Sequence, residues 1–167
     1  MEIINSRRVM NIGVVAGLYA LLNVLCAPLA FDQIQLRFSE MLILLCFFNK
    51  DYIFSLTLGC FITNMNSPMG FVDVGFGTTA SLMAALLIYT LRDKINLFVA
   101  SIIPVVINGF VVAAELYFLS GSPFWQSVAT VSLGEFICVS VLGVLILSYL
   151  SKKRGFMKAI MTGTDIE

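Results

Sequence analysis

The chain has 167 residues, 59% of them hydrophobic and 12% charged, with a formal net charge of zero and a mean hydropathy of +0.97. An ordinary soluble domain is far less apolar, so this composition predicts an integral membrane protein. Zero net charge gives no reason to expect a nucleic-acid partner. Because the chain has no histidine and no CxxC spacing, we expect no metal site and no cofactor, and we interpret its four cysteines as packed free thiols.

The first apolar run follows Arg7 and Arg8 and predicts a helix over about 9–30, long enough at ~1.5 Å per residue to cross a ~30 Å hydrocarbon core. It outlasts the h-region of a secretory signal, so we expect the N-terminus to be retained. Small residues recur along it at i, i+3, i+4 and i+7, and such a stripe lets another helix approach closely. The stripe serves either a partner protein or packing within this chain; it consists of Gly13, Ala16, Gly17 and Ala20.

Two shorter apolar segments predict helices over about 36–48 and 52–65. At ~20 Å each is short for a full crossing, so we expect a hairpin whose outer ends stop inside the protein, with Lys50 and Asp51 at its turn. The polar segments 33–40 and 64–73 flank this hairpin and therefore lie on one side of the membrane. Three longer helices are then predicted over about 73–91, 95–119 and 123–150, which completes a six-helix all-α bundle in a single membrane domain, 1–167.

The charges predict the orientation of this bundle. Nine of the ten basic residues fall in segments that we expect in the cytoplasm, together with both termini, and the exception is Arg37. Five acids fall in the outer half instead, which leaves that half electronegative. The nine basic residues are Arg7, Arg8, Lys50, Arg92, Lys94, Lys152, Lys153, Arg154 and Lys158, and the five acids are Asp32, Glu40, Asp73, Glu115 and Glu135.

A carboxylate that faced lipid would cost several kcal/mol or become protonated, so these acids are expected to point inward toward partners. The protein supplies one compensating cation, and a cationic ligand is therefore expected. Two local alternatives stay open at this point. Arg37 and Glu40, three residues apart on one helix, are also spaced for a mutual salt bridge. Asp73 is also a suitable N-cap for the helix that we expect to begin there.

No activated nucleophile motif or metal-ligand cluster indicates an enzyme. The chain also lacks a Walker A loop, so active uptake would require partner ATPases.

The segments QLRFSE (35–40) and NMNSPMGFVDVGFGT (64–78), with the six-helix layout, resemble the QueT-type substrate-binding (S) component of energy-coupling factor (ECF) transporters. The resemblance covers essentially the whole chain. It implies a subunit of the bacterial plasma membrane that captures a nutrient outside and delivers it through a transmembrane T subunit with two ATPases. The Ala-xxx-Ala motif that contacts the T subunit in this family matches Ala16 and Ala20.

The ligand implied by the resemblance is a queuosine precursor, chiefly preQ1 (7-aminomethyl-7-deazaguanine). Its ammonium group suits one carboxylate, and the N1–H and exocyclic amine of its guanine edge suit a second one. Asn64 or Asn108 is a suitable partner for the ring carbonyl. The predicted substrate-binding residues are Arg37, Glu40, Asn64, Asp73, Asn108, Glu115 and Glu135.

Three other functions remain open: an S component for another cationic nutrient, a proton-coupled cation exporter with Glu135 as its protonation site, and a purely structural membrane protein. The last explains no buried acid.

Overall fold

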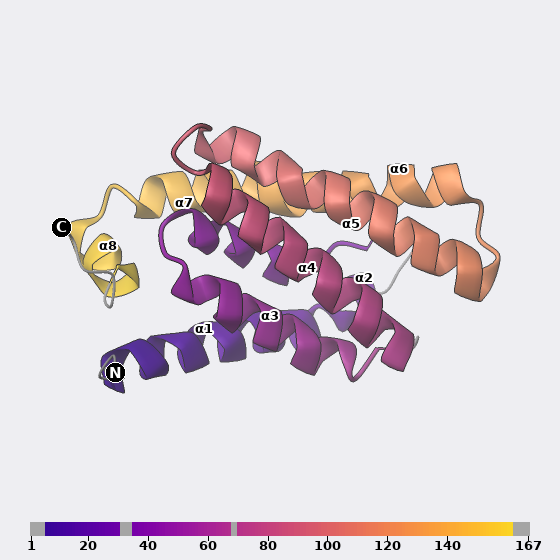
Figure 1. Ribbon diagram of the computed structural model, residues 1–167, viewed down its shortest axis with the longest axis horizontal. Helices are drawn as coiled ribbons and strands as arrows, with labels where there is room; N and C mark the ends of the chain where they lie inside the picture. The colour runs from indigo at the N-terminus through magenta and orange to yellow at the C-terminus, as the bar shows by residue number, and fades with distance from the viewer. Residues whose placement is uncertain (1–5, 31–34, 68–69, 162–167) are drawn as a thin grey trace.

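The computed structural model describes residues 6–30, 35–67 and 70–161, and every regular element among them is helical. Figure 1 shows an elongated bundle in which the longer helices run roughly along one axis. The all-α fold expected from the sequence is confirmed for this part of the chain. The elements are α1 (Ser6–Leu25), α2 (Ala27–Ala30), η1 (Phe38–Phe47), α3 (Asp51–Asn64), α4 (Phe71–Leu91), α5 (Leu97–Ser120), α6 (Phe124–Glu135), η2 (Phe136–Gly143), α7 (Val144–Leu150) and α8 (Arg154–Ile160).

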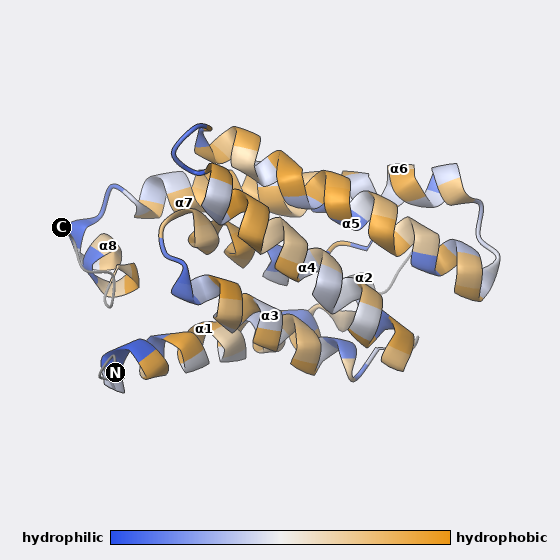
Figure 2. Ribbon diagram, in the orientation of Figure 1, coloured by the Kyte–Doolittle hydropathy of each residue, from blue (hydrophilic) through white to orange (hydrophobic). Residues whose placement is uncertain are grey.

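Four apolar helices within the described ranges are long enough to cross a membrane: α1, α4, α5, and the continuous helix Phe124–Leu150 that α6, η2 and α7 form together. Many large apolar side chains are exposed on the outside of the bundle, which suits a surface that faces lipid. Hydrophobic residues predominate along the long helices, as the colours of Figure 2 show. The shorter η1 and α3 pack among these helices. The expected count of six crossings stays a prediction.

Two elements depart from α geometry, and they pack against each other. η1 is a 3-10 helix of ten residues, whereas such helices are usually only three or four residues long. η2 is a π-helix that starts directly after Glu135. The contact is close because Gly143 of η2 has no side chain: a Cβ there would lie 3.1 Å from the Cβ of Met41 in η1. Packing in the interior thus accompanies non-α geometry on both sides of the contact.

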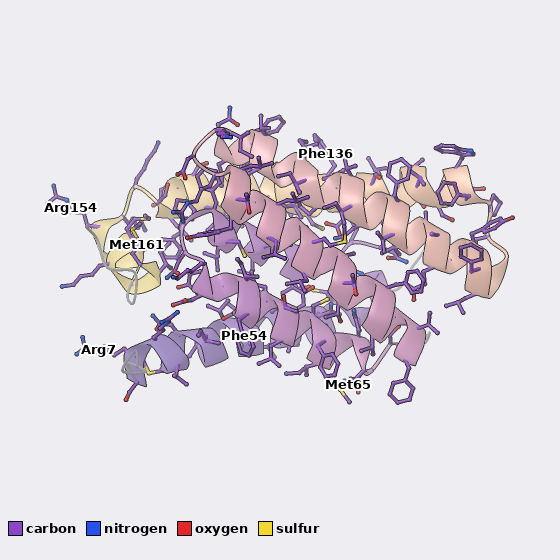
Figure 3. All side chains as sticks on the ribbon, in the orientation of Figure 1. Arg7, Phe54, Met65, Phe136, Arg154 and Met161 are labelled. Atoms are coloured by element: carbon purple, nitrogen blue, oxygen red, sulfur yellow. The ribbon has the colours of Figure 1, made fainter. Side chains whose placement is uncertain are left out.

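The start of α1 and the short α8 lie at the same end of the bundle (Figure 1), where Figure 3 shows the side chains of Arg7 and Arg154. Hydrogen bonds to the backbone carbonyl oxygens at the end of α8 hold this helix against the bundle. Ile160 O accepts hydrogen bonds from Asn49 Nδ2 at 2.9 Å and Tyr52 Oη at 3.1 Å. Asn11 Nδ2 of α1 donates to Ala159 O at 3.0 Å. The basic tail therefore folds back on the bundle, which composition alone does not predict.

Two helix starts explain how the site residues are placed. α4 begins at Phe71, two residues before the expected start, after Gly70, whose φ of 66° favours glycine. α5 begins at Leu97, where the side chain of Asn96 accepts a hydrogen bond from the Val99 N–H at 2.8 Å. The four cysteines are free, and three of them are buried.

Candidate functional site

Glu40 lies in η1 with none of its surface exposed, and two hydroxyl groups hold one of its oxygens. Tyr19 Oη of α1 donates a hydrogen bond to Glu40 Oε1 at 2.5 Å, and Ser81 Oγ of α4 donates to the same oxygen at 3.2 Å. Glu40 Oε2 has no hydrogen-bond partner among the described residues. Three helices therefore meet at this carboxylate, and one of its oxygens remains available.

Arg37, which precedes the first residue of η1, forms an ion pair with Asp73 of α4, its Nη2 lying 3.8 Å from Asp73 Oδ1. Both side chains are almost fully buried. The separation is too long for a direct hydrogen bond, so the pair is held by charge. The local salt bridge considered above is not the arrangement found, because Glu40 instead accepts from Tyr19 and Ser81.

Asn64 and Asp73 bring the ends of α3 and α4 together. Asn64 Nδ2 donates to the Asp73 carbonyl oxygen at 3.2 Å. Gly77, one turn further along α4, makes this approach possible: a Cβ there would lie 2.5 Å from Asn64 Nδ2 and 3.0 Å from Asp73 Oδ1. Asp73 is not the N-cap of α4, since Gly70 occupies that position and the helix has no side-chain cap. The capping alternative is therefore wrong, and the Asp73 carboxylate faces the interior.

The two acids on the later helices are also buried. Asn108 Nδ2 of α5 donates to Glu135 Oε1 at 2.8 Å, and the other oxygen, Oε2, has no hydrogen-bond partner in the described part of the chain. Glu115 of α5 is 1% exposed, and neither of its oxygens has such a partner. The charges of Asp73 and Arg37 act on Glu115. Those of Glu40 and Arg37 act on Glu135.

These residues form one polar cluster around Arg37, which we call the acid cluster: Arg37, Glu40, Asn64, Asp73, Asn108, Glu115 and Glu135. Four carboxylates against one guanidinium give it a formal charge of −3 if every acid is ionised. Five carboxylate oxygens have no hydrogen-bond partner among the described residues, namely Glu40 Oε2, Asp73 Oδ1, both oxygens of Glu115 and Glu135 Oε2. Buried carboxylates in this state either take up protons or require a cation with several hydrogen-bond donors.

The sequence pattern missed three residues of this region. Tyr19 and Ser81 hold Glu40, but a tyrosine and a serine within apolar helices carry no signal of their own. Gln35 was only part of a polar segment; it is 6% exposed, its Oε1 has no described hydrogen-bond partner, and its φ is 48°. Positive φ at a residue other than glycine is a strained conformation that tends to occur at functional sites. Asp32, one of the five outer acids, lies outside the described residues.

The stripe of small residues on α1 is split between two environments. Ala16 is buried against α3, where a Cβ on Gly59 would lie 3.0 Å from the Ala16 carbonyl oxygen, and Ala20 is half-buried. Gly13 and Gly17 are exposed, with open space around the position of a Cβ. The exposed pair thus offers a flat surface on the outside of the bundle, and partner docking through this stripe stays a prediction.

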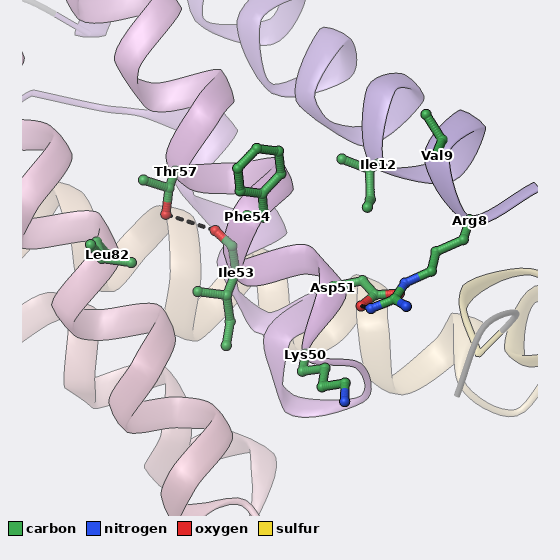
Figure 4. Close-up of a pocket in the computed structure, with 9 residues that line it drawn as sticks. All are labelled: Arg8, Val9, Ile12, Lys50, Asp51, Ile53, Phe54, Thr57 and Leu82. Carbon is green, nitrogen blue, oxygen red and sulfur yellow. Dashed lines mark hydrogen bonds and ion pairs between the residues drawn. The ribbon is translucent and has the colours of Figure 1, made fainter. Parts of the chain in front are cut away.

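Apolar cavities lie between the helices at two places in the described part of the chain, and no member of the acid cluster lines either of them. The larger, of about 680 Å³, lies between α1, α3 and α4 and is drawn in Figure 4. The smaller, of about 400 Å³, lies between α4 and α5 and includes Val106. The acid cluster is instead closed within the bundle, since its seven side chains belong to residues that are 4% exposed or less.

Comparison with known proteins assigns the chain to a family. Residues 9–152 match the model of the family described as QueT transporter. The chain is 33% identical over 158 residues to the protein named Queuosine precursor transporter QueT of Lactococcus lactis subsp. cremoris strain MG1363, which covers 87% of this chain and 92% of that protein. No solved structure matches. With a family match over most of its length and a relative of this identity and coverage, the chain belongs to the QueT transporter family.

Proposed function

We propose that this chain is the substrate-capture subunit of an ECF-type importer and that it binds a queuosine precursor, preQ1 first among them, in the outer half of the membrane. Membership of the QueT family and the name of the Lactococcus lactis relative support a transporter of this substrate class rather than an enzyme. The observation that carries the proposal is the acid cluster, in which four carboxylates and a single arginine are buried within the bundle. A membrane protein that gained nothing from these charges would not keep them away from water.

The unused oxygens suggest how the ligand is oriented. Both oxygens of Glu115 lack a hydrogen-bond partner among the described residues, so this carboxylate suits the two parallel donors of the guanine edge, N1–H and the exocyclic amine. Glu135 and Glu40 each have one oxygen fixed and one available. A single available oxygen suits the point charge of the aminomethyl ammonium. We therefore assign the guanine edge to Glu115 and the ammonium to Glu135 with Glu40.

The same proposal accounts for Arg37. In the empty protein the guanidinium lies among four carboxylates and offsets part of their mutual repulsion. A bound cation adds the second compensating charge. The net charge of the acid cluster then changes from −3 to −2, which lowers the free-energy cost of keeping its carboxylates ionised. Asp73 forms the ion pair with this guanidinium, so in this proposal it positions Arg37 and does not bind the ligand.

Transport would need partners. The chain contains no nucleotide-binding motif, so the energy for uptake comes in this proposal from two ATPase subunits that act through a T subunit docked on α1. We place both termini in the cytoplasm, with the acid cluster toward the opposite face. An exporter driven by protons at Glu135 is the competing proposal, because that carboxyl group is buried with one oxygen unused. An exporter works without ATPase partners, whereas the S component does not.

Titration of the purified chain with preQ1, 7-methyl-7-deazaguanine and guanine tests the proposal. The methyl analogue keeps the guanine edge and lacks the ammonium. We expect preQ1 to bind most tightly, with the methyl analogue weaker by at least roughly tenfold, the typical effect of losing one charge-assisted contact. Equal affinity for preQ1 and the methyl analogue would show that the ammonium group makes no favourable contact in the site. Absence of binding to all three would overturn the substrate class.

A further inference from the structure

The larger cavity, which we call the α1–α3 groove, has the chemistry of a site for an amphipathic molecule. Its walls are apolar side chains of three helices, among them Ile12 of α1, Phe54 of α3 and Leu82 of α4. The polar group of Thr57 is already used, because its hydroxyl donates to the Ile53 carbonyl oxygen at 2.7 Å. The volume of about 680 Å³ falls in the ~300–1,000 Å³ range of ligand pockets.

Charged groups occur at one end of the groove, around the start of α3 (Figure 4). Arg8 binds Asp51 through two hydrogen bonds, Nε to Oδ2 at 2.6 Å and Nη2 to Oδ1 at 2.5 Å. A bidentate pair of this kind fixes both side chains and cancels their charges. The neighbouring Lys50 is exposed, and its ammonium group makes no hydrogen bond or ion pair with any described residue. The groove therefore has one uncompensated positive charge at one end and hydrocarbon along the remainder.

We propose that the α1–α3 groove binds an anionic phospholipid, with one acyl chain along Ile12, Phe54 and Leu82 and the phosphate next to Lys50. Charge complementarity selects this occupant: a molecule that fills the groove needs a long apolar part and a single anionic group at one end. The groove opens on the surface of α1 and α3, where neighbouring exposed side chains such as Val9 and Phe54 are apolar. In a membrane this surface is in contact with lipid, so the ligand is available at high local concentration.

The smaller cavity supplies an internal comparison. It is lined by Leu87, Val99, Ile102, Ile103, Val106 and Ile107, none of which is charged. Lipid that occupies it is held by apolar contact alone, and no headgroup preference is expected. Comparison of the α1–α3 groove with the smaller cavity therefore distinguishes a selective lipid site from nonspecific coating of the protein by lipid.

Quenching of a single tryptophan by brominated lipid tests the proposal. Trp125 is the only tryptophan of the chain, so Trp125→Phe gives a silent background into which Phe54→Trp places one indole in the α1–α3 groove. Phe54 is 64% exposed, and the exchange needs no internal rearrangement. The full chain is reconstituted in phosphatidylcholine–phosphatidylglycerol vesicles with bromine on one lipid or the other. Phosphatidylglycerol should associate with this indole roughly fivefold more strongly than phosphatidylcholine, as one basic residue predicts.

Three matched variants decide the outcome. Lys50→Gln in the same background should abolish the preference, whereas Lys94→Gln, which removes an exposed lysine from the loop after α4, should leave it intact. Val106→Trp, used in place of Phe54→Trp, should show equal quenching by both lipids. Equal quenching at the α1–α3 groove, a preference that survives Lys50→Gln, or the same preference at Val106 would overturn the site. If neither lipid quenches the indole, the groove is closed to lipid and the proposal is also wrong.

Discussion

Tyr19 and Glu40 are joined by a hydrogen bond of 2.5 Å between the phenol Oη and the carboxylate Oε1. Both residues are almost completely buried, and the bond connects α1 to η1. Tyr19 lies on α1 between Gly17 and Ala20, two members of the stripe that we expect to face a partner subunit. The helix proposed to dock on the partner thus also holds one of the acids proposed to bind the ligand. A displacement of α1 would therefore move the hydroxyl group that donates a hydrogen bond to Glu40.

Tyr19→Phe should weaken this connection without changing the size of the side chain appreciably. Loss of a buried hydrogen bond to a charged group typically costs ~1.5–3 kcal/mol, so the unfolding temperature in detergent should fall by several degrees. PreQ1 affinity should also fall, because Glu40 then depends on Ser81 alone. Tyr149→Phe is the matched control, since Tyr149 is 62% exposed. If the two variants unfold at the same temperature, the Tyr19–Glu40 bond contributes nothing measurable.

Gly77→Ala should disrupt the acid cluster through steric contact. Its Cβ would meet Asn64 Nδ2 and Asp73 Oδ1, so one of these side chains must move and the approach of α3 to α4 loosens. Gly75→Ala is the control on the same helix, because nothing lies within 4 Å of its Cβ position. We expect Gly77→Ala to lose at least roughly tenfold in preQ1 affinity, whereas Gly75→Ala binds normally and, through helix propensity, is slightly stabilised. Normal binding by both variants would show that ligand binding does not need this geometry.

The sequence pattern predicted the composition of the acid cluster better than its connections. Arg37, Glu40, Asn64 and Asp73 were expected on one side because they flank a hairpin, and the structure brings them together. Their pairing was not predictable from spacing. Arg37 pairs with an acid 36 positions later, because helix packing selected Asp73 over the nearer Glu40.

The stripe on α1 illustrates a second limit. At ~100° per residue, its four members cover an arc roughly 100° wide, in the order Ala16, Ala20, Gly13 and Gly17. The edge of the contact with α3 runs through this arc, so one end is buried and the other exposed. Periodicity gives the arc but not the direction in which a neighbouring helix lies. The 3-10 geometry of η1 and the π-helix η2 escape prediction for the same reason, since tertiary packing accompanies both.

Glu115→Gln and Glu135→Gln should separate the two ends of the ligand. If Glu115 binds the guanine edge, its replacement should weaken preQ1 and 7-methyl-7-deazaguanine alike, by at least roughly tenfold. Replacement of Glu135 should weaken preQ1 strongly and the methyl analogue little. Calorimetric titration of both variants with both ligands measures this pattern. The opposite pattern would exchange the two assignments.

A stability measurement distinguishes a binding role for these acids from a structural one. Each substitution removes one negative charge from a cluster with a formal charge of −3, so the empty protein should unfold at the same temperature or a higher one. Asp73→Asn is the contrasting variant, because it breaks the ion pair with buried Arg37 and should destabilise the protein. If Glu115→Gln destabilised the empty protein as much as Asp73→Asn, the acid would be structural.

The predicted topology is testable with reporters. The start of α1, α8 and the side chains of Arg7 and Arg154 lie at one end of the bundle (Figure 3), and the positive-inside rule puts that end in the cytoplasm. A reporter that is active only in the cytoplasm should work when fused after Lys158. The same reporter inserted at Gly121, between α5 and α6, should be silent. Activity in the reverse arrangement would invert the orientation and move the acid cluster to the cytoplasmic half.

Bulky residues on the exposed edge of α1 should separate binding from transport. Gly13→Trp and Gly17→Trp place a large side chain where the structure leaves open space, so the isolated chain should fold and bind preQ1 normally. Uptake with the T subunit and ATPases should fall severely, because a flat helix surface is needed for close approach. Ala16→Trp is a different case: Ala16 is packed on α3, and its replacement should impair folding itself. Full uptake by both glycine variants would exclude this face of α1 as the docking surface, while loss of preQ1 binding in a folded glycine variant would show that α1 acts on the acid cluster directly, through contacts such as Tyr19 to Glu40.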